Sequence, residues 1–480
     1  MLNKNRNRLR AVFSIVLILV TAKQVFGAGT PLDKKDATLP QMKLPDQFAL
    51  VFSFGYVTDF MPKDEKTFET VLQNMKRTGI NTIHCKYYEW RQKLCEKHGV
   101  KMMIDLAVPE HDLKQAPLCR PDEVQATADL SKAEQRFVEL KAKLDKINAE
   151  IGQVNAQAAG AQDKKALADK LAELQGRKQT LEKEKSLQIG ANIKAICEKV
   201  KGSNGVWGYG LWYDNGTNGS FLNHAVEKLR TWDPTHVTFV GSYRHRGLES
   251  VTLNPGCYGW YDFHWSRGTL WHHLDMMVLH DICKRRNAVV GRYVAYSGLQ
   301  QDLYTLNQSI AAGLKMALFF IGGPLSRDTH EWGDDQDLVK IAAELRHIYK
   351  ELAKIGHPLA YYSTPITKDH ANKPCKQGIP RWFKPVPTDH WAQVTSGEAV
   401  VGFFRYKDGT DAVFVANHNA FASQKMTLSL KPTAGKRLSV QMFDRAKGGW
   451  KPLELNETSV SFHLGAGCGE LLKITGVASQ

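Results

Sequence analysis

Apolar residues along this chain follow two periodicities, which alternate from residue 48 onward. Short apolar runs typical of buried strands alternate with segments in which apolar residues recur every three or four positions, as on one face of a helix. The strand-like runs lie at 48–57, 80–88, 100–108, 206–213, 236–243, 257–263, 287–297 and 315–323. The helical patterns lie at 64–79, 89–99, 189–201, 220–230, 270–285 and 302–314. This alternation predicts parallel strands joined by helical crossovers.

The number of these units predicts the architecture of the sheet. An open doubly wound sheet would have about six strands and a glycine-rich phosphate loop after the first strand. No G-x-G-x-x-G pattern follows the run at 48–57. Eight units in series fit a closed (β/α)8 barrel, the TIM barrel. We therefore predict an α/β fold whose barrel covers residues 45–385.

A long polar segment, 131–188, interrupts the pattern between the third and fourth strands. The apolar residues of its first half have the spacing of a heptad seam: Phe137, Leu140, Leu144, Ile147, Ile151 and Val154. After a break, the seam returns at Leu167, Leu171, Leu174 and Leu181. Two such runs predict an inserted, antiparallel helical coiled-coil hairpin. The hairpin is either an inert insertion or an arm for oligomerisation or for clamping a partner over the active face.

Helical patterns stop after about residue 390. The segments that follow are short and alternate apolar with polar residues, and a Lys-Asp-Gly-Thr turn joins the first two, within 397–419. This pattern predicts an all-β sandwich over residues 390–478.

The first 27 residues have a different character. A head that contains Lys4, Arg6, Arg8 and Arg10 precedes an apolar stretch at 11–22. As a helix this stretch would be roughly 18 Å long, short of the ~30 Å hydrocarbon core of a membrane. We therefore predict a removable signal peptide at 1–27 and a secreted or periplasmic location. No later stretch is expected to cross a bilayer.

The net charge limits the classes of molecule that the chain is expected to bind, and the cysteine content bears on disulfides and metals. The formal net charge is +15, and removal of residues 1–27, with five Lys/Arg and no acids, lowers it to about +10. This excess indicates either a solvated basic surface or attraction to an anionic polysaccharide. Nucleic acid is not expected, because no basic motif is interleaved with aromatic residues. Eight cysteines in 480 residues do not indicate a disulfide scaffold, and no spacing suggests a metal.

The fourth strand-like run ends in a carboxylate and an amide, Asp214 and Asn215, directly after Trp212 and Tyr213. In a closed barrel of parallel strands, the carboxyl ends of all strands lie on the face that holds the active site. Aromatic rings that can stack on sugars, beside a carboxyl that can transfer protons, are typical of carbohydrate sites. The alternative interpretation is that Asp214 closes the strand in an Asx turn.

Four segments carry a resemblance to known proteins: "FETVLQNMKRTGINTI", "VKMMIDLAV", "VWGYGLWYDN" and "GELLKIT". Over roughly residues 45–475, apart from the insertion, the chain resembles glycoside hydrolases built on a (β/α)8 barrel with a C-terminal β-sandwich. In their large retaining clan, strand four ends in Asn-Glu, with Glu as the acid/base, and strand seven ends in a nucleophilic Glu. This chain departs at both places, with Asp214-Asn215 at the first and no carboxylate within 289–298.

A second resemblance is to α-galactosidase-like barrels, in which an Asp closes strand four in a similar "YDN" setting and another Asp lies on strand six. Asp262 occupies about that place here. The candidate catalytic residues are therefore Asp214, Asp262, Glu331 and Glu110. The candidate substrate-binding residues are Trp212, Tyr213, Asn215, Trp260, His264, Trp265, Arg244, His111 and Trp332. Asp262 has the alternative of an ion pair with Arg244 or Arg267, and Asp105 is interpreted as a structural acid of the core.

Together these patterns predict an exported glycoside hydrolase that acts on a poly- or oligosaccharide, with neither a cofactor nor a metal. Its carboxylates would lie at the carboxyl ends of barrel strands. Because the seventh strand has no carboxylate, a barrel that binds carbohydrate without cleaving it is the alternative. A scaffolding protein organised by the coiled-coil hairpin is a third interpretation.

Overall fold

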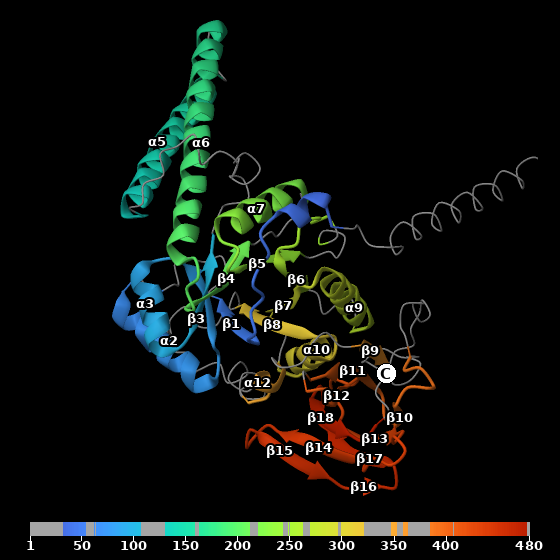
Figure 1. Cartoon of the computed structure of the whole chain (residues 1–480). Helices are drawn as coiled ribbons and strands as arrows, with labels where there is room; N and C mark the ends of the chain where they lie inside the picture. The colour runs from blue at the N-terminus through green and yellow to red at the C-terminus, as the bar shows by residue number, and fades with distance from the viewer. Residues whose placement is uncertain are drawn as a thin grey trace, which may run out of the picture.

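Eight parallel strands form a closed barrel in the computed structural model of the chain (Figure 1). The structure describes residues 32–53, 62, 64–106, 130–158, 163–211, 219–242, 248, 250–262, 269–295, 299–320, 347–352, 359–362, 385–406 and 408–477. Strands β1 to β8 are Ala49–Ser53, Thr82–Lys86, Lys101–Asp105, Val206–Leu211, Val237–Ser242, Gly256–Asp262, Val289–Ala295 and Leu314–Phe320. Each strand pairs with the next, and β8 pairs with β1, so the predicted barrel is confirmed.

Helices surround the barrel. They include α2 (Glu65–Thr78), α3 (Glu89–His98), α7 (Gly219–Trp232), α9 (Thr269–Arg286), α10 (Leu299–Ala311) and α12 (Ile348–Leu352). The carboxylate of Asp64 accepts a 2.8 Å hydrogen bond from the backbone N–H of Thr67 and so caps α2. Gly79 ends α2 with a φ of 88°, which glycine adopts without steric cost. Within the ranges above, no helix has both the length and the apolar character needed to cross a membrane.

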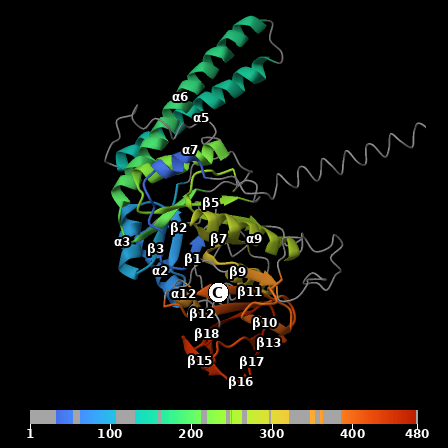
Figure 2. The same ribbon diagram turned by 45° about the vertical axis from the view of Figure 1, so that its right-hand side comes forward.

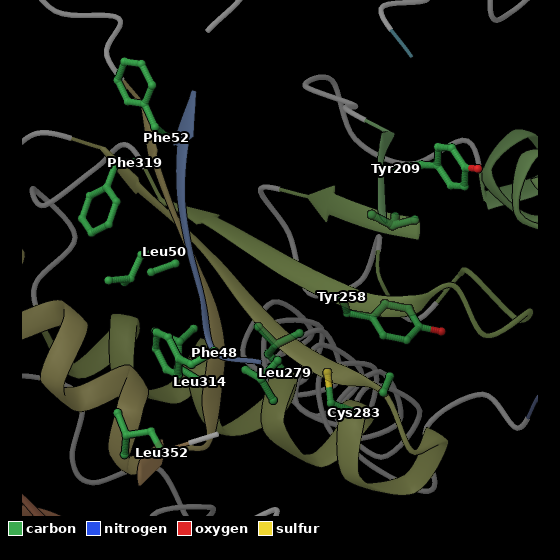
Figure 3. Packing of buried hydrophobic residues seen from close by; sticks show 14 of the residues in the cluster. Phe48, Leu50, Phe52, Tyr209, Tyr258, Leu279, Cys283, Leu314, Phe319 and Leu352 are labelled. Carbon is green, nitrogen blue, oxygen red and sulfur yellow. The ribbon is translucent and has the colours of Figure 1, made fainter. Parts of the chain in front are cut away.

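Two apolar layers hold the barrel together. The outer layer contains Leu50 and Phe52 of β1 and Phe48 just before it, together with residues of the surrounding helices (Figure 3). The inner layer fills the barrel interior and includes Phe239 of β5. A Cβ atom at Gly259 would lie 1.9 Å from the Phe239 ring, so glycine on β6 makes room for this aromatic side chain.

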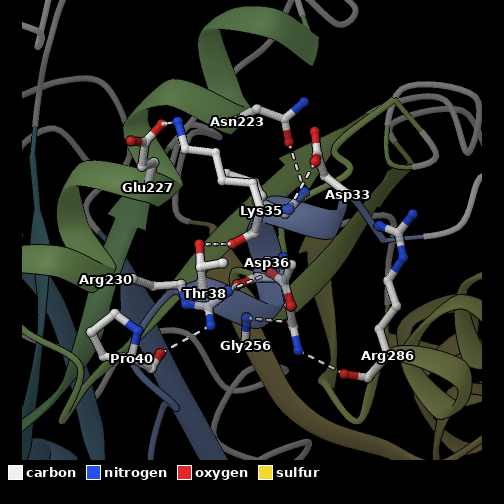
Figure 4. A network of polar contacts seen from close by, with 12 residues as sticks. Asp33, Lys35, Asp36, Thr38, Pro40, Asn223, Glu227, Arg230, Gly256 and Arg286 are labelled. Atoms are coloured by element: carbon white, nitrogen blue, oxygen red, sulfur yellow. Dashed lines mark hydrogen bonds and ion pairs between the residues drawn. The ribbon is translucent and has the colours of Figure 1, made fainter.

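Residues 32–44 cover the amino end of the barrel, a feature that the sequence analysis did not predict. Asp36, in a short 3-10 helix, forms an ion pair with Arg230 at the end of α7 (Figure 4). The same carboxylate accepts a 2.7 Å hydrogen bond from the backbone N–H of Asn254, which precedes β6. Leu44 packs against the inner layer. Because α7 ends and β6 begins on this side, the segment closes the barrel opposite the carboxyl ends of the strands.

Two long helices, α5 (Leu130–Ala158) and α6 (Lys164–Val200), lie side by side and project from the barrel (Figures 1 and 2). Five predicted seam residues are buried: Leu140, Leu144, Ile147, Val154 and Leu174. The other five are partly buried: Phe137, Ile151, Leu167, Leu171 and Leu181. The apolar spacing therefore identified the faces that pack together. That the two helices wind about each other as a coiled coil stays a prediction.

The helix predicted at 189–201 is present as the last part of α6, which runs through residue 189 without a break from the inserted segment. Gly190 lies within the helix and does not interrupt it, since an isolated glycine only weakens a helix. Ile193, Cys197 and Val200 belong to the outer layer of the barrel core. Only residues 201–205 lie between the end of α6 and the start of β4.

The C-terminal region consists of two antiparallel sheets, as predicted for a β-sandwich. One sheet has the order β10 (Ala392–Ser396), β13 (Gln424–Leu430), β17 (Ser459–Leu464) and β16 (Leu455–Asn456). The other has the order β15 (Gly449–Leu453), β14 (Ser439–Asp444), β18 (Gly469–Thr475), β12 (Asp411–Asn417), β11 (Ala399–Arg405) and β9 (Leu359–Tyr362). Strand β9 lies within the range assigned to the barrel from the sequence, yet it pairs with β11 of this sheet.

Helix α10 joins the barrel to the sandwich through buried polar contacts. Gln308 donates a 2.9 Å hydrogen bond to the backbone carbonyl of Asn417, and Asn307 donates one of 3.0 Å to that of Gly467. A Cβ atom at Gly402 would lie 2.1 Å from the carbonyl oxygen of Ala311, so the sheet backbone directly abuts the helix. These contacts fix the sandwich against the barrel.

Candidate functional site

The carboxyl ends of all eight barrel strands lie on one face, which is where barrel enzymes bind and transform substrates. Two residues predicted for the site, Trp260 and Asp262, lie in β6 with their backbones paired to Arg292 and Val294 of β7. The structure describes the backbones of these two residues but not their side chains. The remaining predicted residues lie outside the described ranges: Asp214, Glu331, Glu110, Trp212, Tyr213, Asn215, His264, Trp265, Arg244, His111 and Trp332. Their roles stay predictions.

The described part of this face contains a row of three polar side chains from three adjacent strands, Ser53 of β1, His84 of β2 and Asp105 of β3. Ser53 Oγ lies 2.9 Å from His84 Nδ1. His84 Nε2 lies 3.9 Å from Asp105 Oδ1. The row thus connects a hydroxyl, an imidazole and a carboxylate across the mouth of the barrel.

Strand alternation and register explain why these side chains meet. Val51 and Met103 belong to the inner layer, and Ser53 and Asp105 lie two residues further along the same strands. Ser53 pairs with His84 between β1 and β2. A Cβ atom at Gly210, in β4, would lie 2.5 Å from His84 Nε2, so glycine at this position leaves room for the imidazole.

Burial determines the protonation of His84. The residue is 7% exposed, and burial lowers its pKa, although the nearby charge of Asp105 acts in the opposite direction. A neutral imidazole carries one N–H. If the Ser53 hydroxyl donates to Nδ1, that N–H is on Nε2, the nitrogen nearer to Asp105. At 3.9 Å the contact between His84 Nε2 and Asp105 Oδ1 is electrostatic, because it is longer than a hydrogen bond.

Exposure increases along the row. Ser53 is 1% exposed and His84 7%, whereas the Asp105 side chain is 20% exposed. Asp105 is therefore the member that can contact a bound molecule. The sequence analysis treated Asp105 as a structural acid and did not single out Ser53 or His84. Polar residues at equivalent ends of three successive strand-like runs were the signal that could have identified the row.

A second polar cluster lies near the amino end of β5 and is separate from this face. Asp233 is fully buried, and its Oδ2 lies 2.6 Å from both the Tyr209 hydroxyl and His236 Nδ1. His236 Nε2 lies 2.9 Å from the carbonyl oxygen of Ser203. Both ring nitrogens of His236 thus lie within hydrogen-bond distance of an oxygen atom. This cluster joins the start of β5 to β4 and to the end of α6.

Burial by itself would raise the pKa of Asp233. Hydrogen bonds from His236, Thr235 and Tyr209 outweigh burial and lower the pKa to about 2. The carboxylate is therefore charged at any pH in which the protein would work, and its hydrogen bonds are internal. We assign this cluster to stability rather than to chemistry.

Comparison with known proteins finds similar structures but no similar sequence family. No family model matches this chain, and neither does a curated protein. Its structure is similar to that of an α-amylase from Geobacillus thermoleovorans, with 10% identity, 89% of this chain and 98% of that chain covered, and a TM-score of 0.44. It is also similar to a GH27 β-L-arabinopyranosidase from Geobacillus stearothermophilus, with 11% identity, coverage of 93% and 98%, and a TM-score of 0.45.

A third similar structure is the isomalto-dextranase of Arthrobacter globiformis T6, with 10% identity, coverage of 90% and 73%, and a TM-score of 0.47. The assignment of the barrel and the two antiparallel sheets rests on the strand order of this chain itself.

Proposed function

We propose that this chain is an exported glycoside hydrolase that cleaves a poly- or oligosaccharide at the carboxyl-end face of its barrel. The row of Ser53, His84 and Asp105 carries this proposal, because it places a partly exposed carboxylate with an ordered imidazole at the mouth of a closed barrel. Carboxyl groups are the usual acids, bases and nucleophiles of glycoside hydrolysis. Export is proposed from the basic and apolar pattern of residues 1–27.

Asp214 and Asp262 are the proposed catalytic pair, with Glu110 and Glu331 next. Asp214 is proposed because it directly follows the apolar run that contains β4, and the carboxyl ends of barrel strands carry the active site. Asp262 is proposed because it is the last residue of β6, on the same face.

A carbohydrate-binding barrel without catalysis is the second candidate, and a specific observation favours it. Strand β7 (Val289–Ala295) and the residues up to 298 contain no carboxylate, so a nucleophile at that strand end is absent from the sequence. If the chain is catalytic, its acid and base come from other strands.

The test is to incubate the purified mature chain with a panel of neutral and anionic polysaccharides and 4-nitrophenyl glycosides. We expect new reducing ends or nitrophenol from at least one of them. Binding without release would replace the hydrolase by the carbohydrate-binding barrel, and neither binding nor release would contradict both. N-terminal sequencing of the exported protein tests the proposed cleavage after residue 27.

A further inference from the structure

The carboxylate of Asp105 has the position of a substrate ligand, although the sequence analysis interpreted it as structural. It ends β3, pairs with Lys86 of β2 and Gly210 of β4, and is the most exposed member of its row. A carboxylate on the interior register at the carboxyl end of a barrel strand lies where a bound molecule enters.

The two side chains behind Asp105 are arranged to hold it rather than to react. His84 presents Nε2 to Asp105 and Nδ1 to Ser53, and both His84 and Ser53 are buried. Among the described residues, the groups that face His84 include Ser53 from β1, Asp105 from β3 and the bare backbone of Gly210 from β4. Asp105 thus places a negative charge beside the imidazole.

We propose that Asp105 binds hydroxyl groups of the glycan in the proposed hydrolase, that His84 is its positioning residue, and that Ser53 fixes the orientation of the His84 ring. The inference rests on the proposed function and adds a carboxylate on β3 to the site. A charged carboxylate that accepts hydrogen bonds from sugar hydroxyls contributes more than a neutral acceptor, because such bonds are charge-assisted.

The Ser53 hydroxyl gives the row its direction. A hydroxyl that donates to Nδ1 places the ring proton on Nε2, where it faces Asp105. Without the hydroxyl, the proton can occupy either nitrogen, and the ring can turn away from Asp105. The effect of Ser53 on turnover therefore passes through His84 and Asp105.

The first experiment uses whichever 4-nitrophenyl glycoside the wild-type protein cleaves. Asp105→Asn is nearly isosteric and should raise KM so that kcat/KM falls about 10- to 100-fold, the usual effect of losing a hydrogen bond to a charged group. Asp281→Asn is the matched control, because Asp281 is exposed on α9 and pairs only locally with Arg285. Asp105→Glu, which keeps the charge, should retain more affinity than Asp105→Asn.

The second experiment separates positioning from a merely structural role. Ser53→Ala should lower kcat/KM and Ser53→Thr, which keeps the hydroxyl, should restore it. Nitrogen-15 NMR of His84 should show the Nε2–H tautomer in the wild type and in Ser53→Thr, and a tautomer mixture in Ser53→Ala. Equal tautomer populations in all three proteins would overturn the assignment of Ser53.

The outcomes distinguish this inference from the function on which it rests. If the wild type cleaves a glycoside and Asp105→Asn cleaves it with unchanged KM and kcat, the inference is wrong and the hydrolase stands. If the wild type cleaves no glycoside or polysaccharide of the panel, the proposed function is wrong and this inference fails with it.

Discussion

The hydroxyl of Tyr209 in β4 donates a 2.6 Å hydrogen bond to the buried carboxylate of Asp233, just before β5. Removal of this donor by Tyr209→Phe would leave the charge of Asp233 with one partner fewer in a site without water access. We expect the free energy of unfolding to fall by about 1.5–3 kcal/mol, as for other hydrogen bonds to charged groups. A urea titration monitored by circular dichroism measures this free energy.

Tyr87→Phe is the matched control for that variant. The Tyr87 hydroxyl donates a 3.1 Å hydrogen bond to the neutral amide oxygen of Gln92. Loss of a neutral bond costs about 0.5–1.5 kcal/mol, so this variant should be the more stable of the two. The reverse order would show that Asp233 does not depend on the Tyr209 hydroxyl.

The same carboxylate predicts how stability depends on pH. Asp233 has a folded-state pKa of about 2 against 3.8 for an ordinary Asp. A lowered pKa stabilises the fold above the unfolded value, and this contribution is lost as pH falls from about 4 toward 2. The difference corresponds to about 2 kcal/mol. Unfolding free energies measured from pH 5 to pH 2 should fall by this amount more in the wild type than in Asp233→Asn.

Asp214→Asn should leave the fold intact, because the amide is nearly isosteric, and lower turnover by on the order of 10²–10⁴-fold. Asp262→Asn tests the second member of the proposed pair in the same assay, with Asp281→Asn as control. NMR of the first anomer released should show either inversion through an activated water or retention through an Asp nucleophile on strand four. Full activity in both variants would transfer the assignment to Glu110 and Glu331.

The helices α5 and α6 should be dispensable for glycan cleavage. Phe137 of α5 packs against the outer layer of the barrel core. The part of α5 and α6 near Phe137 therefore belongs to the fold, whereas the part farther from the barrel does not support its core. Deletion of residues 143–178, with a short Gly/Ser turn in their place, should leave kcat/KM within about twofold. A deletion of 131–188 that also removes Phe137 should be less stable, since burial of a Phe contributes about 1.5–3 kcal/mol. Loss of activity in the shorter deletion would instead give the arm a role in binding.

The positive charge predicts a dependence on salt if the substrate is anionic. The mature chain would carry about +10. The Debye length falls from about 30 Å at 0.01 M to about 8 Å at 0.15 M salt, so steering of an anionic polysaccharide should weaken over this range. We expect kcat/KM to fall several-fold on uronic or sulfated glycans and to stay constant on neutral ones. A constant rate on both would favour the solvated-surface interpretation.

The strands and most barrel helices were predictable because each follows from a local pattern. Strand β1 is buried on both faces, and its apolar run shows this directly. The row at the barrel mouth was not predictable in the same way. Ser53, His84 and Asp105 meet only because of the register between neighbouring strands, and that register depends on closure of the whole barrel.

Two further features lie beyond local patterns for different reasons. Residues 32–44 have no periodicity, and Asp36 finds its place only through Arg230 and Asn254, which are distant in sequence. The continuity of α6 was not predicted, because the heptad seam of the insertion ends at Leu181 and the barrel pattern resumes at residue 189.

The helices between β3 and β4 also affect how the barrel folds. Asp105 and Val206 end and begin neighbouring strands, yet all of α5 and α6 separates them along the chain. The entropy of closing a flexible loop grows with the logarithm of its length, and pairings between distant residues slow folding. Helices α5 and α6 pack mainly against each other, so they can form from contacts near in sequence before the strands meet. In the nascent chain, the folded pair α5 and α6 then acts as a short connection between β3 and β4. Its length along the sequence therefore does not delay closure of the barrel.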